Sequence, residues 1–234
     1  MMIDTDYHSH ILPGMDDGAA DIQTSLVLLS MLRDQGIKTV AATSHFNVRK
    51  ESIDSFISRR DKAYEELVNA CKSGQYPRVV RSAEVALYEG ISKHDLRPLC
   101  YEGTDLILLE MPRLPYGDWI DNELSAIAYD QKLVPVIAHL DRYMEWYSKT
   151  EIDDLLSFED ALIQINTHAF LKKNTLKKIV QIIGGGRTVL LGSDAHDLEK
   201  RVPNFDSVYK VMKSFKYRKK ILPLLEAACE RIKI

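Results

Sequence analysis

The sequence predicts an α/β fold in which about seven parallel strands, each followed by a helix, close into a barrel. Short apolar segments rich in β-branched residues alternate along the chain with longer segments of helical periodicity. The strand segments are apolar almost throughout, which is typical of parallel strands covered by helices. No repeat, low-complexity stretch or Pro/Gly/Ser-rich linker divides the chain, so we expect one domain over residues 1–234.

The first part of the chain shows this alternation clearly. Residues 1–7 (MMIDTDY) form a short apolar run, and residues 21–36 follow with helical periodicity up to Gly36, a residue type that often ends helices. Residues 37–45 (IKTVAATSH) are short and β-branched, as in a strand. Apolar residues at helical spacing then predict a long amphipathic helix over about 52–73.

The rest of the chain repeats the pattern. The remaining predicted strands are short apolar runs at 78–87, 104–111, 133–139, 161–167 and 188–194. The remaining predicted helices are at 119–131, 151–157, 172–183, 204–214 and near 218–231. Three consecutive glycines, 184–186, predict a helix-ending turn before the last strand.

Composition limits the function. Lys plus Arg number 31 and Asp plus Glu number 34, and the net charge of −3 gives no support for binding to nucleic acids or membrane surfaces. No apolar run is long enough for a transmembrane helix, and the N-terminus does not resemble a signal peptide, so we expect no membrane insertion. Cys71, Cys100 and Cys229 form no zinc-type pair or disulfide framework, which favours a reducing, cytoplasmic location. The oligomeric state is not predicted.

Side chains that can bind metal ions stand at the carboxyl ends of the predicted strands. Six of the seven histidines are among them, and the exception is His94 in a polar segment. Because the carboxyl ends of barrel strands lie on one face, we expect these side chains to converge. Carboxylates brought close together are costly unless cations compensate them. The residues are His8 with His10, His45, Glu84, Glu110, His139, His168, and Asp194 with His196.

The donor types narrow the choice of metal. Any single His or Glu at a strand end is more often a loop or capping residue, but the whole set indicates a metal cluster. Imidazole and carboxylate without thiolate suit Mn²⁺, Fe or Zn²⁺ and disfavour a cysteine-type structural zinc site. Because each metal ion binds only about four to six donors, this many donor residues require about two or three ions. A carboxylate such as Glu84 can bridge two of them.

The same residues form motifs that resemble a known family. HSH, TSH, AE, IAH and SDAH resemble the polymerase-and-histidinol-phosphatase (PHP) superfamily of metal-dependent phosphoesterases. The longer motifs DYHSHILPGMDDGAAD, TSHF, IAHLDRY, QIN and GSDAHDLEKRVP resemble one group within it, the bacterial manganese-dependent tyrosine-protein phosphatases linked to capsule and exopolysaccharide synthesis. The match runs in order from residue 4 to about residue 204.

The resemblance implies a distorted, TIM-like (β/α)7 barrel with a trinuclear metal site. It implies a phosphotyrosyl protein as partner, namely the tyrosine-rich tail of a bacterial tyrosine kinase of polysaccharide synthesis. Arg142 of HLDRY and Arg201 of DLEKRVP match the family's phosphate-binding arginines. The chain departs from the family pattern after TSH, where it has FNVRK, and after QIN, where it has THAF. The implied metal ligands are His8, His10, His45, Glu84, Glu110, His139, Asp194 and His196.

The expected chemistry is hydrolysis of a phosphate monoester. Bound metal ions lower the pKa of water to about 7 and so supply hydroxide at neutral pH. The guanidinium fork of Arg142 can bind two phosphate oxygens, although Arg142 also fits a surface ion pair with Asp141 or Glu145. A phenolate leaves more readily than an alkoxide, so a tyrosyl phosphate needs less help from a general acid.

The proton donor is open. Asp16, Asp17 and His168 are candidates because they stand near the expected ligands. Asp16 and Asp17 equally fit the cap of the helix that begins near residue 20. His168 also fits a supporting position beside the metal site.

Other functions are compatible with the same residues. A phosphoesterase for histidinol phosphate or another small metabolite would use the same metals, and a more enclosed pocket would indicate it. The segment 113–120 (RLPYGDWI) places Tyr116 and Trp119 either beside a phosphotyrosine ring or in a packed turn. A metal-binding module without catalysis is a third reading. A nuclease is disfavoured because no basic stripe is present.

Overall fold

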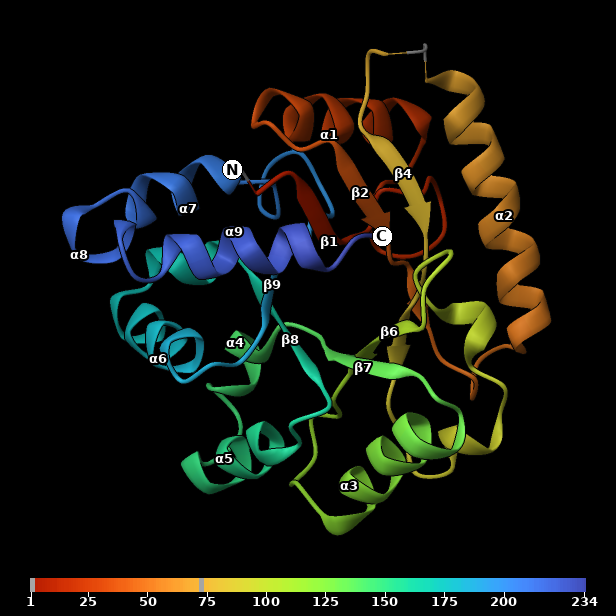
Figure 1. Ribbon diagram of the computed structural model, residues 1–234. Helices are drawn as coiled ribbons and strands as arrows, with labels where there is room; N and C mark the ends of the chain where they lie inside the picture. Colours follow the sequence, from red (N-terminus) through yellow and green to blue (C-terminus); the bar gives the residue numbers. More distant parts are fainter. Residues whose placement is uncertain (1–2, 72–73) are drawn as a thin grey trace.

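The computed structural model describes residues 3–71 and 74–234 (Figure 1). The first two residues of the predicted strand 1–7 and the last two of the predicted helix 52–73 lie outside the described residues. The fold is mixed α/β, with parallel strands that curl around the centre of the molecule and helices that cover them on the outside (Figure 1).

All strand pairs within the two sheets are parallel, as the apolar strand segments predicted. The first sheet has the order β1-β2-β4, with β1 (Thr5–Ser9), β2 (Thr39–Ala42) and β4 (Arg78–Arg81). The second has the order β3-β5-β6-β7-β8-β9, with β3 (His45–Phe46), β5 (Glu84–Ala86), β6 (Leu106–Glu110), β7 (Val134–Ile137), β8 (Leu162–Asn166) and β9 (Val189–Gly192).

Two of the predicted strands are broken in the middle. The segment 37–45 divides into β2 and β3, and the segment 78–87 divides into β4 and β5. At the first break the Thr43 N–H donates to the Ser9 carbonyl at 2.9 Å, and the Ser9 N–H donates to Thr43 Oγ1. The breaks depend on these long-range partners, which local β propensity does not report. At the other edge, a parallel bridge from Ser9 to Ala195 places β1 beside the end of β9.

The helices begin where local signals place them. Asp21 caps α1 by accepting from the Thr24 N–H at 2.8 Å, so neither Asp16 nor Asp17 is the cap of this helix. Ser148 and Glu151 form a complete capping box at the start of α5. The main helices are α1 (Ile22–Asp34), α2 (Ile53–Ala70), α3 (Asp118–Ser125), α5 (Lys149–Ser157), α6 (Lys173–Gly184), α7 (Phe205–Met212), α8 (Phe215–Arg218) and α9 (Leu222–Arg231).

Several short elements differ from the prediction. The predicted helix 119–131 ends as a π-helical turn, η3 (Ala126–Asp130). The predicted helix near 218–231 begins at Leu222 as α9, and the separate turn α8 precedes it. The turns η1 (Ile91–Lys93), η2 (Arg97–Leu99), α4 (Leu140–Tyr143) and η4 (Thr167–Leu171) were not predicted, because elements of three to five residues carry too little periodicity. Of these, α4 and η4 directly follow β7 and β8 and shape the rim of the site.

Buried tyrosines pack beneath the carboxyl ends of the strands and form hydrogen bonds to the backbone there. Tyr7, Tyr101 and Tyr143 are almost fully buried, and the Tyr101 hydroxyl donates to the Tyr7 carbonyl at 2.8 Å. The Tyr143 hydroxyl accepts from the Met111 N–H at 2.7 Å, and its ring lies 5.3 Å from that of His139. The polar site therefore lies directly above closely packed side chains of the core. Within the described segments, no helix combines the length and apolarity needed to cross a bilayer.

Candidate metal centre

The structure brings the eight predicted ligands together at the carboxyl ends of the strands. Each side chain is supplied by the end of a strand or by the loop that follows it, as the barrel geometry predicted. His45 and Glu110 are half-buried, and the other six are buried: His8, His10, Glu84, His139, Asp194 and His196. So many buried ionisable groups in contact indicate a site built around positive charge.

Glu84 lies at the centre of the histidines. Its Oε2 is 3.2 Å from the Nε2 atoms of both His8 and His10 and 3.0 Å from His45 Nδ1. Its Oε1 is 2.8 Å from His139 Nε2. Burial alone raises the pKa of Glu84, but the surrounding imidazoles hold that pKa well below its usual range. The carboxylate is therefore kept ionised, as a bridging metal ligand must be.

His8 and His10 face each other through the nitrogens that are free to bind a metal. Their Nε2 atoms are 3.1 Å apart. Each Nδ1 atom already has an acceptor, Gln164 Oε1 at 3.0 Å for His8 and Asp16 Oδ2 at 2.8 Å for His10. Since these oxygens only accept, both Nδ1 atoms carry a proton, and the two Nε2 atoms are the nitrogens left to bind a metal. In the metal-free site a proton on His10 occupies this place, and a bound metal ion would replace it.

The protonation of the histidines shows how strongly the site favours positive charge. Burial lowers the pKa of His10, but hydrogen bonds and charge from Asp16 and Glu84 raise it to about 10. Burial and the neighbouring His10 lower the pKa of His196 to about 3, so this imidazole is neutral. His196 Nε2 is buried without a hydrogen-bond partner among the described atoms. A neutral nitrogen in this state is a ready metal ligand.

The ligand atoms form three overlapping groups, each compact enough to hold a metal ion. In each group, one atom from every residue lies within 4.8 Å of the others. The groups are His10, Asp17, His45 and His196; His8, His10 and Asp194; and His45, Glu84 and Glu110. Mixed imidazole and carboxylate donors in overlapping groups fit a cluster of ions.

Asp17, expected only as a proton donor or helix cap, is also a candidate metal donor. Its Oδ1 atom lies 3.4 Å from His45 Nε2 and 3.5 Å from His196 Nε2, although its side chain is 65% exposed. The available signal was its place in the HSH…DDG motif, but the conformation of the connecting loop decides that Asp16 is buried against His10 while Asp17 lies at the exposed rim.

Asp194 is held by two arginines, one in α4 and one in the loop that follows β9. Arg142 Nη2 pairs with Asp194 Oδ2, and Arg201 Nη2 lies 2.9 Å from Asp194 Oδ1. Arg142 therefore does not form the surface ion pair with Asp141 or Glu145 that the sequence left open. Both predicted arginines lie at the edge of the metal centre, where they can reach a bound anion.

The backbone is strained at two of the predicted ligands. His139 has φ of +29° and Asp194 has φ of +53°, in the left-handed region that side chains with a Cβ rarely adopt. Such residues cost about 1–3 kcal/mol and occur mainly at functional sites. Hydrogen bonds hold both in place, from the His139 N–H to Gln164 Oε1 at 2.6 Å and from the Asp194 N–H to the His8 carbonyl at 2.7 Å.

Comparison with known proteins supports the resemblance drawn from the motifs. The family described as capsular polysaccharide synthesis, CpsB/CapC, matches residues 4–227. The chain belongs to the CpsB/CapC family.

Relatives in this family span nearly the whole chain. Tyrosine-protein phosphatase YwqE of Bacillus subtilis is 28% identical over 225 residues, covering 90% of this chain and 84% of its own. Tyrosine-protein phosphatase CpsB of Streptococcus pneumoniae is 26% identical and covers 88% of each chain. The fold is similar, with a TM-score of 0.77 and 23% identity over 96% of this chain and 92% of the other, to a chain from crystal structures of YwqE and CpsB, described as unique metal-dependent tyrosine phosphatases.

Supporting residues of this CpsB/CapC chain were only partly predicted. Asp16 accepts hydrogen bonds from the N–H groups of His45 at 2.8 Å and Gly18 at 3.0 Å as well as contacting His10, and its pKa is lowered despite burial. It therefore orients a ligand rather than holding a transferable proton. The QIN motif assigned no role to Gln164, yet this residue is fully buried and supports both His8 and His139. A Gln inside an apolar strand was the available signal.

The structure places His168, Tyr116 and Trp119 in three different environments. His168 is half-buried in η4, where burial lowers its pKa and the charge of Asp194 opposes that shift. No hydrogen bond or ion pair among the described side chains joins His168 directly to the metal centre. The Tyr116 hydroxyl donates to Asp121 at 2.5 Å, and the ring packs against Tyr147, as in a packed turn. Trp119, in contrast, lines the groove beside the centre.

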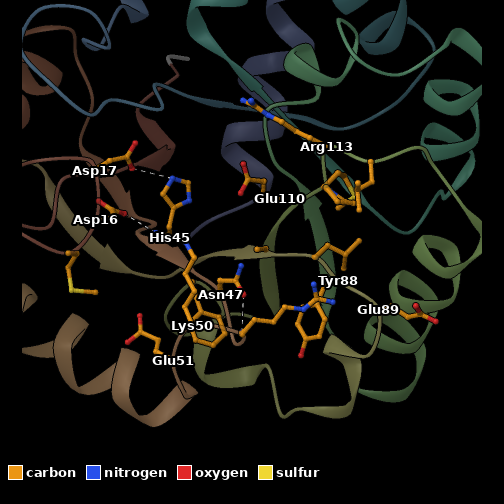
Figure 2. Close-up of a pocket in the computed structure, with 18 of the residues that line it drawn as sticks. Asp16, Asp17, His45, Asn47, Lys50, Glu51, Tyr88, Glu89, Glu110 and Arg113 are labelled. Carbon is orange, nitrogen blue, oxygen red and sulfur yellow. Dashed lines mark hydrogen bonds and ion pairs between the residues drawn. The ribbon is translucent and has the colours of Figure 1, made fainter.

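An open groove of about 930 Å³ adjoins the metal centre. Figure 2 shows Asp16, Asp17 and His45 at one end, Tyr88 and Glu89 at the other, and Glu110 between them. The groove is therefore wide and continuous with the candidate metal ligands, rather than a closed chamber around them.

Proposed function

We propose that this chain is a metal-dependent protein-tyrosine phosphatase of polysaccharide synthesis, which hydrolyses phosphotyrosine in proteins. The single observation that carries the proposal is the pair of facing Nε2 atoms of His8 and His10 around Glu84, a buried cluster joined through His45 to an open groove. The names of the CpsB/CapC relatives supply the substrate class, since they are tyrosine-protein phosphatases.

We also propose that the curled parallel strands form a barrel. We count β2 with β3 and β4 with β5 as single bent strands, which makes seven strands in a distorted TIM-like barrel within one domain, 1–234. The bridge from Ser9 to Ala195 supports closure between the first and last strands. Closure of this kind explains why ligands from both ends of the sequence meet.

The resident metal in this proposal is Mn²⁺, with two or three ions, and Fe or Zn²⁺ would be accepted by the same donors. The residues fit such a group, because Glu84 Oε2 and His196 Nε2 are buried without hydrogen-bond partners among the described atoms. When bound, the ions activate water for attack on phosphorus and neutralise the charge of the phosphate. The ligands are the eight predicted residues together with Asp17: His8, His10, Asp17, His45, Glu84, Glu110, His139, Asp194 and His196.

The arginines bind and orient the phosphate. Arg142 and Arg201 approach Asp194 from opposite oxygens, so a phosphate beside Asp194 lies within reach of both guanidinium groups. Their positive charges stabilise the charge that builds up on the phosphate oxygens during transfer. Asp16 acts through His10, whose ring it fixes, rather than as the proton donor. Phenolate can leave without a strong general acid.

The width of the groove favours a protein substrate over a metabolite. The groove of about 930 Å³ is open to solvent, whereas a site for a small metabolite encloses most of the surface of its ligand. We propose the tail of a bacterial tyrosine kinase as the partner, in line with the family's description by capsular polysaccharide synthesis. The free thiols of Cys71, Cys100 and Cys229 support the cytoplasmic location of such an enzyme.

Hydrolysis of a phosphotyrosyl peptide, compared with histidinol phosphate, tests this function. The protein is stripped with EDTA, reloaded with Mn²⁺ and assayed on both substrates, with the stripped protein as control. Manganese-dependent cleavage of the peptide with little release from histidinol phosphate is expected. The reverse preference would assign the site to metabolite chemistry, and bound metal without activity on either would favour a non-catalytic module.

A further inference from the structure

The distribution of positive charge is strongly uneven. The stretches 168–182 and 207–225 contain no Asp or Glu. Together they contribute ten exposed cations, which we call the basic face: Lys172, Lys173, Lys177, Lys178, Lys210, Lys213, Lys216, Arg218, Lys219 and Lys220. The other 21 basic residues, 31 less these ten, accompany 34 acidic residues. The net charge of −3 therefore does not report the uneven distribution of charge over the surface, and it does not predict whether one face binds an anionic surface.

The fold places the two stretches on one flank. The turn η4 contacts both α6 and α7, and α7 contacts α8. Figure 1 shows α6, α7 and α8 on one side of the molecule and α2 on the opposite side. Within the described part of the chain, the one ion pair of these ten side chains joins Lys172 to Glu145 at 2.8 Å. The other cations are left to attract an external anion.

We propose that the basic face docks this protein on an anionic lipid surface. Nine of its ten cations are lysines, and the ammonium group is a hydrated point charge suited to diffuse attraction rather than to fixed bidentate pairing. Protein interfaces are instead enriched in arginine and depleted of lysine. Clusters of this size on a surface are typical of binding to acidic lipid headgroups.

Apolar and aromatic side chains accompany the lysines. Leu171 is 57% exposed directly before Lys172, and Leu224 is 47% exposed at the start of α9. The ammonium of Lys216 lies 5.2 Å from the ring centre of Tyr217, and Tyr side chains favour the boundary between headgroups and water. A flank with lysines, tyrosine and isolated leucines can rest on a bilayer without any spanning helix.

Vesicle co-sedimentation of the full chain tests the proposal. Vesicles of phosphatidylcholine with about one third phosphatidylglycerol should bind the protein at low ionic strength and release it at about 0.5 M salt, where charges are screened over a few ångströms. Pure phosphatidylcholine vesicles should not bind it. Each lysine near the membrane surface strengthens vesicle binding roughly fivefold. The triple variant K213Q/K216Q/K219Q should therefore bind the anionic vesicles on the order of 100-fold more weakly than the wild type.

A matched variant separates this effect from net charge. K62Q/K93Q/K132Q removes three exposed lysines elsewhere and should bind vesicles like the wild type. Both variants should keep their circular dichroism spectra and their turnover of a small phosphate ester. Equal vesicle binding by the two triple variants, or tighter wild-type binding to duplex DNA than to the vesicles at the same ionic strength, would overturn the proposal.

Discussion

The Nε2 atoms of His8 and His10 face each other at 3.1 Å while Asp16 and Gln164 hold the opposite nitrogens of the two rings. Alternating residues at the end of an extended strand point to one side, which is why HSH brings both rings to one place. The supporting acceptors fix the two rings and so direct both Nε2 atoms to the same point. This relationship underlies the predictions that follow.

His10→Ala should remove most of the phosphatase activity, by at least about 100-fold, without unfolding the protein. The substitution takes one ligand from two of the three compact groups, so the bound metal should fall as well. Metal content, peptide hydrolysis and circular dichroism measure the three effects. His94→Ala at an exposed histidine is the matched control and should change none of them. Turnover like the wild type in metal-replete His10→Ala would contradict the cluster mechanism.

Asp16→Asn should weaken metal binding by about 10–100-fold, because the carboxylate that fixes His10 Nδ1 is lost. Excess Mn²⁺ should therefore restore most of kcat. Titration of activity against free metal measures both quantities. If kcat stays low at saturating metal while metal affinity is unchanged, Asp16 acts as a proton donor, as the sequence left open.

Arg142→Ala should leave metal binding nearly intact while phosphotyrosyl hydrolysis falls by about 100-fold or more, since the guanidinium is assigned to the phosphate. Inhibition by inorganic phosphate should weaken in parallel. Arg142→Lys should restore little, because an ammonium cannot replace the fork. Arg97→Ala, at an exposed arginine paired with Asp105, serves as the control. Unchanged phosphate inhibition in Arg142→Ala would remove this assignment.

Gln164→Leu should lower the free energy of unfolding by about 3 kcal/mol, because the buried His8 Nδ1–H and His139 N–H lose their acceptor. Urea denaturation of the metal-free protein measures this without interference from metal binding. Gln23→Leu, at an exposed glutamine in α1, should change the stability by less than about 0.5 kcal/mol. Equal effects of the two substitutions would show that Gln164 is not a support of the site.

Metal loading should raise the melting temperature. Free Mn²⁺ at about 100 times its Kd adds roughly 2.7 kcal/mol to the stability of the folded state, or about 5–10 °C for a chain of this size. Calcium at the same concentration should give less, because it prefers oxygen ligands. Differential scanning calorimetry with and without EDTA gives the shift. An identical transition in both samples would argue against a structural metal cluster.

The sequence predicted the convergence of the ligands because barrel strands end on one face, and this holds for residues as distant as His8 and His196. It could not predict that Asp17 lies at the exposed rim beside His45 while the buried Asp16 side chain supports His10, since loop conformation decides between adjacent aspartates. The break at Thr43 depends on Ser9, a partner far along the chain. The basic face was not predicted, because the net charge of the whole chain does not say where on the surface the charged side chains lie.

A crystal of the Mn²⁺-loaded protein, measured at the manganese absorption edge, tests the central claim most directly. The account predicts an anomalous peak about 2.0–2.3 Å from the Nε2 atoms of both His8 and His10. A map of the metal-loaded protein without anomalous density at this distance from both nitrogens would contradict it.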